Sequence, residues 1–249
     1  MLTAERHQII LNLLEEQKVV KLQELVDATS SSESTIRRDL SQLEKEKKLK
    51  RVHGGAALLN QKREELSMSE RSAKNLREKA EIARCAASLV RKGDCIYLDA
   101  GTTTMQMISF LNAEDIVVVT NGITHLEALL EKNIPTYIIG GAVKPVTRAL
   151  IGQGAMRGLE QYRFDKSFIG VNGIHLEYGF TTPDPEEAAV KARAISLAQK
   201  AYVLADHTKW GESTFAKIAD LDEAIIITDA YGEELLPYKE KTRIEVVET

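Results

Sequence analysis

A short run of small and hydroxylated residues, 101–104 (GTTT), follows an apolar stretch that ends in Asp99. Glycine lets the backbone approach a ligand closely, and successive amides and hydroxyls can point at the same anion. The run leads into a helical pattern that we expect to begin near Met105, and the start of a helix favours negative charge. These residues predict a cradle that suits a phosphate better than a carboxylate, because a phosphate accepts from several donors at once. An ordinary helix N-cap is the alternative, and neither a Walker A loop nor a GxGxxG turn is present.

Polar and glycine residues recur where other apolar stretches end, among them Asn121, Gly122 and Gly141. We expect strands at residues 95–99, 116–120, 136–141, 166–171, 201–206 and 224–229. Short apolar strands separated by helical patterns predict an α/β domain with a mostly parallel sheet that is covered on both faces. One such strand end is ordinary turn chemistry. A series of them in one sheet predicts a ligand pocket at the edge where the strands end.

Charged residues later in the chain could complete this pocket. Lys191 and Lys209 would add positive charge for a phosphorylated ligand, while Asp99 or Glu187 would accept hydrogen bonds from its hydroxyls. Arg148 lies in a predicted loop and is a candidate clamp. Glu187 and Lys191 also stand four residues apart, so a salt bridge on one helix is the alternative for that pair.

The first sixty residues have a different pattern, with three short amphipathic helices in succession. We expect the first over about residues 4–16 and the second over about 19–28, before serines and threonines that can cap the third. In the third helix, Ile36, Leu40 and Leu43 share one face. The polar residues that gather on the opposite face or beside it are Ser34, Arg37, Arg38, Ser41 and Lys45.

A basic hairpin is expected directly after the third helix. The stretch KLKRVHGGAAL predicts two short strands with Gly54 and Gly55 in the turn. Its basic residues include Lys50, Arg51 and His53. Three helices followed by such a hairpin predict a winged helix-turn-helix for double-stranded DNA, with arginines suited to guanine edges or phosphates. The alternatives are a solvated charged helix and, for His53, a turn residue without a role.

Composition limits the class of protein. The 249 residues carry a formal net charge of −4 and are 43% hydrophobic, which is typical of a globular protein rather than one that coats nucleic acid. No apolar run is long enough to span a bilayer, and Cys85 and Cys95 lie in apolar surroundings, so we expect a cytoplasmic protein with buried thiols. No metal-binding motif is present, and we expect neither a metal nor a cofactor. We expect a DNA-binding domain over 1–58, a linker and connecting helix over 59–78, and an effector domain over 79–249.

The segment SSESTIRRDLSQLEKEKKLKRVHGGA resembles the N-terminal signature of the DeoR family of bacterial transcriptional regulators. The resemblance implies a winged helix-turn-helix in which Ser34, Thr35, Arg37 and Arg38 contact operator DNA. The segments YLDAGTTT, VVTNG, DKSFIGVNGI, GFTTPDPEEAAVK and LADHTKWG resemble the effector domain of the same family. That domain has a ribose-phosphate-isomerase-like fold and senses a phosphorylated sugar. The candidate effector-binding residues are Asp99, Gly101, Thr102, Thr103, Thr104, Asn121, Gly122, Gly141, Arg148, Asn172, Gly173, Glu187, Lys191 and Lys209.

Taken together, ESTIRRDLSQLE, CIYLDAGTTT and GFTTPDPEEA most closely resemble the fructose-operon repressors of Gram-positive bacteria. That resemblance implies fructose 1-phosphate as the inducer, although spacing and composition do not separate it from other phosphates. Two hypotheses follow. The first is a ligand-controlled repressor that binds operator DNA as a homo-oligomer, a dimer or a tetramer. The second is an aldose–ketose phosphate isomerase with Asp99 or Glu187 as general base, for which the predicted DNA-binding domain would have no use.

Overall fold

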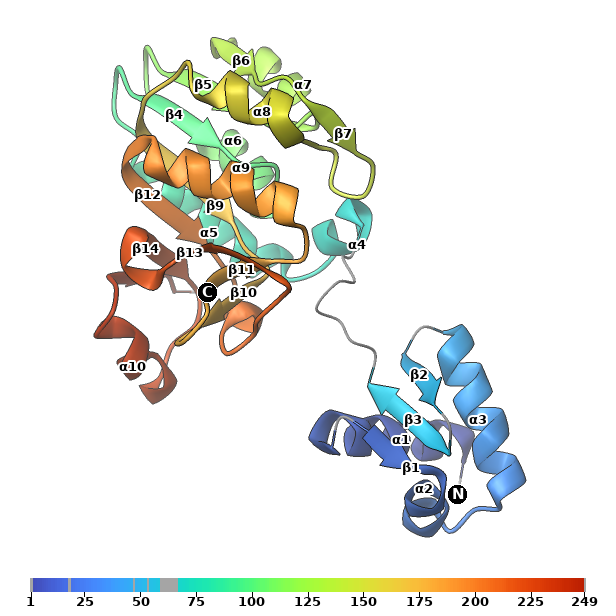
Figure 1. Cartoon of the computed structure of the whole chain (residues 1–249). Coiled ribbons are helices and arrows are strands. Elements are labelled where there is room, and N and C mark those ends of the chain that lie inside the picture. Colours follow the sequence, from blue (N-terminus) through green and yellow to red (C-terminus); the bar gives the residue numbers. More distant parts are fainter. Residues whose placement is uncertain (1, 18, 47, 53, 59–66, 249) are drawn as a thin grey trace. The chain divides into compact units, whose positions relative to one another are not determined.

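In this computed structural model the described residues are 2–17, 19–46, 48–52, 54–58 and 67–248. The chain divides into two compact units, Met1–Gln61 and Lys62–Thr249 (Figure 1). Among the described residues, no helix is both long enough and apolar enough to cross a membrane. His53 lies outside them, as do residues 59–66 of the predicted linker.

The first unit holds three helices and a three-stranded antiparallel sheet with strand order β1-β3-β2. Its elements are α1 (Thr3–Gln17), β1 (Val19–Lys21), α2 (Leu22–Thr29), α3 (Glu33–Lys45), β2 (Leu49–Val52) and β3 (Gly55–Leu58). As their spacing predicts, Ile36, Leu40 and Leu43 of α3 are buried, in one core with Ile10 and Leu14 of α1. The helices and the β2–β3 hairpin confirm the predicted winged helix-turn-helix.

The turn of the hairpin differs from the prediction at one glycine. Gly54 has a φ of 80°, a conformation that favours glycine. Gly55, which we expected in the turn, is instead the first residue of β3. A Cβ atom there would lie 2.2 Å from the carbonyl oxygen of Val20. The close approach of β3 to β1 therefore accounts for Gly55.

The second unit is built on a seven-stranded parallel sheet with strand order β15-β14-β12-β9-β4-β5-β6. The strands are β4 (Cys95–Leu98), β5 (Val117–Thr120), β6 (Thr136–Ile138), β9 (Phe164–Gly170), β12 (Ala198–Leu204), β14 (Ile225–Thr228) and β15 (Ile244–Val246). Successive side chains of β4 enter different cores, since Tyr97 joins one buried cluster while Ile96 and Leu98 join another.

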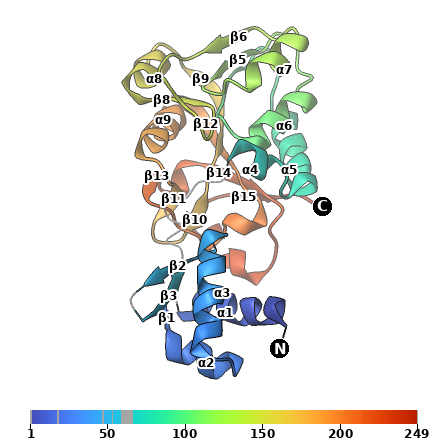
Figure 2. The same ribbon diagram turned by 90° about the vertical axis from the view of Figure 1, so that its right-hand side faces the viewer.

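Helices cover both faces of this sheet (Figure 2). On one face lie α5 (Leu76–Ser88), α6 (Thr102–Phe110) and α7 (His125–Glu131), and on the other lie α8 (Gly152–Leu159) and α9 (Pro185–Ser196). This architecture confirms the predicted mostly parallel α/β domain.

Several short elements surround the main sheet. They are α4 (Met68–Ser72), a hairpin of β7 (Ala142–Lys144) and β8 (Ala149–Ile151), a sheet of β10 (Gly173–His175), β11 (Gly179–Thr182) and β13 (Ala216–Ala219), and α10 (Leu236–Lys239). The sequence did not predict them, because three to five residues are too few to show a hydrophobic period. The helix α4 lies within the stretch 59–78 that we expected to be a linker and connecting helix.

Candidate ligand site and nucleic-acid interface

The strand order of the large sheet reverses between β4 and β9. From β4 the chain proceeds to β5 and β6 on one side, while β9, β12, β14 and β15 lie on the other. In open parallel sheets, ligands bind outside the carboxyl ends of the strands at such a point. Asp99 directly follows β4, and Gly170 ends β9, so both residues stand at this reversal.

A buried ion pair of Asp99 and Lys191 lies at this point. Lys191 Nζ, from α9, donates to Asp99 Oδ2 and to the carbonyl oxygen of Gly170, the latter at 3.0 Å. Asp99 Oδ2 also accepts from the Gly170 N–H at 3.0 Å. The other carboxylate oxygen, Asp99 Oδ1, is buried without a hydrogen-bond partner among the described residues. Burial raises the pKa of Asp99, and the charge of Lys191 opposes that rise. A buried acceptor without a partner is the feature that points to a ligand.

Glu187 lies one turn before Lys191 on α9 but pairs with a different segment. Its Oε1 accepts from the Thr147 hydroxyl at 2.5 Å and lies 3.5 Å from Lys144 Nζ. Lys144 Nζ is also 3.1 Å from Asp184, which caps the start of α9. Lys191 pairs with Asp99. The alternative, a salt bridge between Glu187 and Lys191 on one helix, is therefore wrong. The contacts instead hold the β7–β8 hairpin to α9.

Arg148 ends the loop of that hairpin and is exposed. Its φ of 53° is unusual for a residue with a side chain. Its N–H donates to the Lys144 carbonyl at 2.8 Å, and its carbonyl accepts from the Ile123 N–H at 3.2 Å. The backbone of Arg148 is therefore held on both sides while the guanidinium faces solvent, and its role as a clamp stays a prediction.

A hydrogen-bonded network occupies the carboxyl end of β5. The Thr120 hydroxyl donates to a backbone carbonyl of β4 at 2.6 Å and lies 2.9 Å from Nδ1 of the buried His125. Burial lowers the pKa of His125 to about 4, so the ring is neutral at pH 7. Asn121 Oδ1 accepts from a backbone N–H of the turn at 99–101 at 2.7 Å, and a Cβ on Gly122 would lie 2.8 Å from His125 Nδ1. Asn121 thus positions the turn at 99–101, and the absence of a side chain at Gly122 leaves room for His125.

The three threonines at the start of α6 differ in their contacts. The buried Thr104 hydroxyl donates to the carbonyl oxygens of Asp99 at 2.6 Å and Gly101 at 3.0 Å. These hydrogen bonds lie within the first turn of α6 and satisfy the Thr104 hydroxyl. The helix begins at Thr102, three residues before the predicted start near Met105. Thr102 is partly exposed and Thr103 is nearly buried, and neither hydroxyl has a hydrogen bond to another described residue.

Close backbone packing accounts for two more predicted residues. A Cβ on Gly141 would lie 2.5 Å from the Ile151 carbonyl oxygen, and one on Gly173 would lie 2.4 Å from another carbonyl oxygen. Asn172 Oδ1 accepts from the Thr182 hydroxyl at 3.0 Å. Packing within the fold is sufficient to explain why these residue types occur here. Their contact with a ligand stays a prediction.

A second charged cluster lies at the carboxyl end of β12, two strands away from β4. Asp206 is buried and accepts hydrogen bonds from the Thr208 N–H at 3.0 Å and from the Asn75 side chain, while Lys209 Nζ lies 3.7 Å from its carboxylate. Burial raises the pKa of Asp206, but the charge of Lys209 and these hydrogen bonds outweigh it and lower the pKa below its ordinary value. In the register of the sheet Asp99 is level with Val203, so Asp206 lies two strands across and three residues further along, roughly 14 Å away. Only an extended ligand would contact both clusters.

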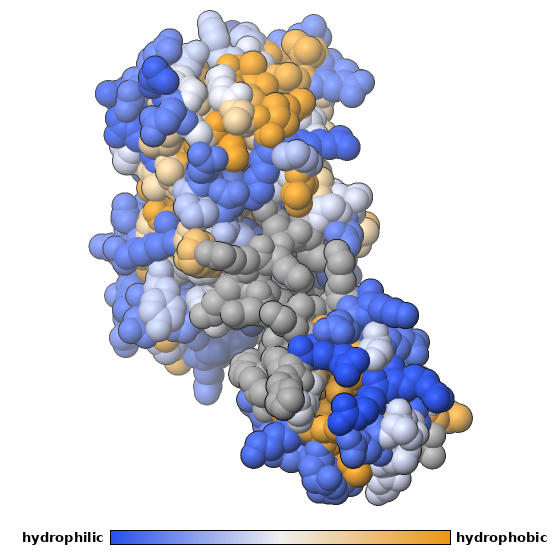
Figure 3. All heavy atoms as spheres, turned by 45° about the vertical axis from the view of Figure 1, so that its right-hand side comes forward, coloured by the Kyte–Doolittle hydropathy of each residue, from blue (hydrophilic) through white to orange (hydrophobic). Residues whose placement is uncertain are grey.

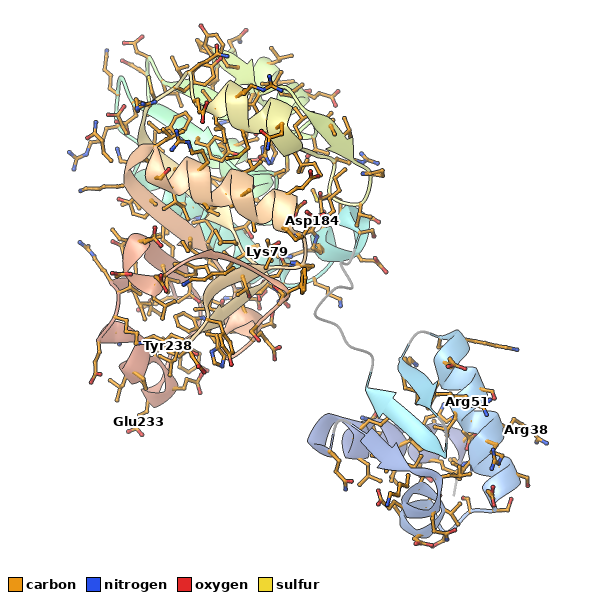
Figure 4. The ribbon with its side chains drawn as sticks, viewed as in Figure 1. Arg38, Arg51, Lys79, Asp184, Glu233 and Tyr238 are labelled. Atoms are coloured by element: carbon orange, nitrogen blue, oxygen red, sulfur yellow. The ribbon has the colours of Figure 1, made fainter. Side chains whose placement is uncertain are left out.

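In the first unit, the predicted DNA-contacting residues of α3 differ in how far neighbouring side chains hold them. Ser34, Arg37 and Arg38 are exposed. Arg37 Nη2 is held by Glu33 at 2.6 Å, and the Thr35 hydroxyl lies 2.8 Å from that of the N-cap residue. Arg38 projects away from α3 and forms no ion pair with the described residues (Figure 4). Of the two arginines of α3, Arg38 is therefore the more available for a contact with DNA.

Hydrogen bonds fix the hairpin against α3. Arg51 Nη1 donates to the Ser41 hydroxyl at 2.8 Å, and the Arg51 N–H donates to Glu44 Oε1 at 2.8 Å. Ser41 and Arg51 therefore belong to one surface, as a winged helix-turn-helix requires. Lys50 lies in β2, paired with Ala57, while the predicted contact His53 falls outside the described residues.

Several buried polar groups were not identified from the sequence. Asp39 of α3 accepts from Arg6 of α1, from Nε at 2.5 Å and from Nη2 at 3.1 Å. Burial raises the pKa of Asp39, but Arg6 outweighs this effect and lowers it below its ordinary value. His125 and Lys79 are also buried. An isolated polar residue within an amphipathic pattern gives no signal for such a partner, because the partner lies elsewhere in the chain.

Comparison with known proteins finds relatives over nearly the whole chain. The family model described as DeoR-like helix-turn-helix domain matches residues 6–62, and that described as DeoR C terminal sensor domain matches residues 74–230. The uncharacterized HTH-type transcriptional regulator FruR of Bacillus subtilis (strain 168) is 56% identical, over 99% of each chain. The HTH-type transcriptional repressor GlcR of the same organism is 36% identical, over 92% of this chain and 89% of GlcR. The lactose phosphotransferase system repressor of Staphylococcus aureus (strain N315) is 33% identical, over 98% of each chain.

Among solved structures, one that matches part of the chain is ribose 5-phosphate isomerase A from Methanocaldococcus jannaschii. It aligns over 55% of each chain, with a TM-score of 0.42 and 17% identity.

Proposed function

This chain belongs to the DeoR family of transcriptional regulators, and on that premise we propose that it represses a sugar-utilisation operon, the fructose operon. It is a regulator rather than an enzyme. The proposed effector is a phosphorylated sugar, fructose 1-phosphate, which releases the repressor from operator DNA in the cytoplasm. Support for fructose comes from the resemblance to fructose-operon repressors and from the 56% identity to FruR.

One observation carries the effector proposal: Asp99 Oδ1, at the reversal of strand order, is buried without a hydrogen-bond partner in the part of the chain that the structure describes. A carboxylate oxygen accepts hydrogen bonds, so a hydroxyl of the effector is its natural partner. Lys209, whose side chain is 30% exposed, would supply a positive charge to the phosphate. A molecule that carries both hydroxyls and a phosphate fits this pair of groups, and sugar phosphates form such a class.

Release of DNA by the effector is the direct test. The full chain would be bound to a DNA site selected from a random duplex pool and titrated with fructose 1-phosphate, fructose 6-phosphate, fructose and inorganic phosphate. We expect fructose 1-phosphate to weaken DNA binding by about 5–150-fold, and unphosphorylated fructose to leave it unchanged. Release by a different sugar phosphate would reject the fructose assignment, and release by none would reject the effector class. Interconversion of sugar phosphates would favour the isomerase alternative.

Arg38 tests the DNA-binding surface separately from the sensor. Replacing Arg38 with alanine should lower operator affinity by about 5–150-fold, because a bidentate arginine contact is worth about 1–3 kcal/mol. Thermal stabilisation by fructose 1-phosphate should be retained. The matched control is Arg91→Ala, which removes an exposed arginine of the second unit and should leave operator affinity unchanged. Equal losses in both variants would contradict a specific role for α3.

We further propose that the repressor acts as a homo-oligomer, with the edge of the large sheet as the contact between two copies. Strand β6 is one of the two edge strands of the large sheet, and no exposed charged side chain lies in residues 137–146, which run from β6 into the β7–β8 hairpin. Tyr137 and Val143 are about half exposed, and the single charged side chain, Lys144, is 14% exposed and paired with Asp184. Figure 3 shows hydrophobic residues gathered on the surface of the second unit. An exposed apolar surface at the edge of a sheet suits contact with a second copy of the chain.

Solution mass tests this contact. We expect the full chain to elute as a dimer or tetramer, and Val143→Glu to lower its mass while the circular dichroism of the folded chain is retained. Tyr231→Glu is the matched control, because Tyr231 is 80% exposed and lies outside this edge. A monomeric wild type, or a variant with unchanged mass, would contradict the proposal.

A further inference from the structure

The helix α4 is the first described element after residues 59–66, through which the second unit is joined to the DNA-binding unit. It has only five residues, too few to be stable as an isolated helix. Its N-cap residue Ser67 satisfies its first turn by a capping box with Glu70. The remaining support must come from contacts with the rest of the second unit.

The start of α4 is tied to the hairpin loop that reaches the candidate ligand site. The Met68 N–H donates to the Val146 carbonyl at 3.3 Å. Thr147, the next residue, donates to Glu187, and Arg148 follows it. A change at Glu187 or Arg148 would therefore act on the start of α4 through two residues of backbone.

The end of α4 is tied to the second charged cluster. Lys79 Nζ donates to the carbonyl oxygens of Arg71 at 2.5 Å and Lys74 at 2.7 Å, and so caps the end of the helix. Figure 4 shows Lys79 in the second unit, and its side chain is 5% exposed. Asn75, between the two helices α4 and α5, hydrogen-bonds Asp206. Asp206 and Lys209 also act on the Lys79 ammonium through their charges.

We propose that α4 couples the ligand site to the DNA-binding unit and that Lys79 is the residue that positions it. The proposal rests on the proposed function. The Lys79 ammonium is attracted by the charge of Asp206 and repelled by that of Lys209. An anionic effector bound at Lys209 would offset the repulsion and so change the net electrostatic interaction on Lys79. Because Lys79 holds the end of α4 and the β7–β8 loop holds its start, that change shifts the preferred position of α4. The chain that leads to the winged helix-turn-helix begins at α4, so the shift is passed to the DNA-binding unit.

Lys79→Met tests this coupling in the full chain. Methionine keeps the length and apolar contacts of the stem but removes the three donors of the ammonium. We expect effector affinity and operator affinity, each measured alone, to stay within about 3-fold of wild type. The factor by which fructose 1-phosphate weakens DNA binding should fall to near one, and by linkage DNA should no longer weaken effector binding. A merely structural role would lower both affinities and leave this factor intact.

Lys132→Met is the matched control, because Lys132 Nζ caps another helix in the same way. It donates to the carbonyl oxygens of Ser109 at 2.8 Å and Leu111 at 2.9 Å, at the end of α6. The coupling factor of this variant should equal that of wild type. If Lys79→Met does not fold, Asn75→Gly tests the same link, since glycine accepts the φ of 51° at Asn75 while losing the bond to Asp206.

The outcomes separate the two proposals. A wild type whose DNA binding ignores every sugar phosphate overturns the proposed function, and the inference falls with it. A wild type that responds, with a Lys79→Met or Asn75→Gly variant that responds equally, overturns the inference alone. Equal loss of response in Lys132→Met would also overturn it, because any helix cap would then have the same effect.

Discussion

Replacing Lys191 with methionine would break the buried ion pair at the reversal of strand order. The side chains of Asp99 and Lys191 are 1% and 7% exposed, so the carboxylate left behind would keep only the Gly170 N–H as a partner. Removing one member of a buried ion pair costs about 3–5 kcal/mol, because the other charge stays buried without compensation. With a urea m-value of about 2–3 kcal/mol per molar, the midpoint of the second unit should fall by roughly 1–2.5 M.

Tryptophan fluorescence is the assay, because the chain has one tryptophan and Trp210 belongs to the second unit. Its indole N–H donates to the Thr228 hydroxyl at 3.1 Å, so its emission reports the packing of this unit. The matched control is Lys92→Met, which removes an exposed lysine paired with Glu114 and Asp115. The control should leave the midpoint nearly unchanged, since exposed pairs contribute little.

The pH dependence of the variant gives an independent check. Burial raises the pKa of Asp99, and the variant lacks the Lys191 charge that opposes this rise. When the folded pKa of a carboxyl lies above its unfolded pKa, the folded state takes up the proton at a higher pH than the unfolded state does. Lowering the pH therefore stabilises the folded state relative to the unfolded state. The stability deficit relative to wild type should therefore shrink between pH 7 and pH 5. Equal shifts in Lys191→Met and Lys92→Met, or a deficit that grows towards pH 5, would refute the reasoning.

Three further predictions concern backbone packing and titration. Gly55→Ala should destabilise the first unit by about 1–3 kcal/mol in circular dichroism, since its Cβ would lie 2.2 Å from the Val20 carbonyl oxygen, and leave the tryptophan-reported transition unchanged. The buried His125 has a pKa of about 4 in the folded state and 6.5 when unfolded. Urea denaturation should therefore show that the free energy of unfolding falls by about 3 kcal/mol between pH 6.5 and pH 4, and His125→Asn should reduce this fall. The hydrogen bond that His207 donates to the Asp229 carboxylate raises the pKa of His207, so the stabilisation from this contact is present below pH 6.5 and is lost as the pH rises through the folded pKa. Asp229→Asn should return the imidazole titration, followed by NMR, towards its ordinary value, and an unshifted titration would contradict the contact.

Local spacing was sufficient to predict most of the longer helices and the central strands, together with the faces they bury. The stripe of Ile36, Leu40 and Leu43 predicted the buried side of α3, because a helix repeats every 3.6 residues whatever surrounds it. Apolar stretches followed by polar residues likewise predicted the parallel strands and the edge at which Asp99 stands. The family resemblance added the candidate residues, and it did so from motifs that are continuous in the sequence.

The partners of the buried polar groups were decided only by the tertiary structure. Lys191 could have paired with Glu187 on its own helix, yet it pairs with Asp99, which is 92 residues away. Arg6 and Asp39 are 33 residues apart. The order of the strands determines which charged groups meet, and a buried charge then takes the partner that the fold brings within reach. The sequence by itself determined which apolar faces are buried and which strand ends are polar, while the arrangement of the sheet decided that Asp99 keeps one oxygen without a hydrogen-bond partner among the described residues.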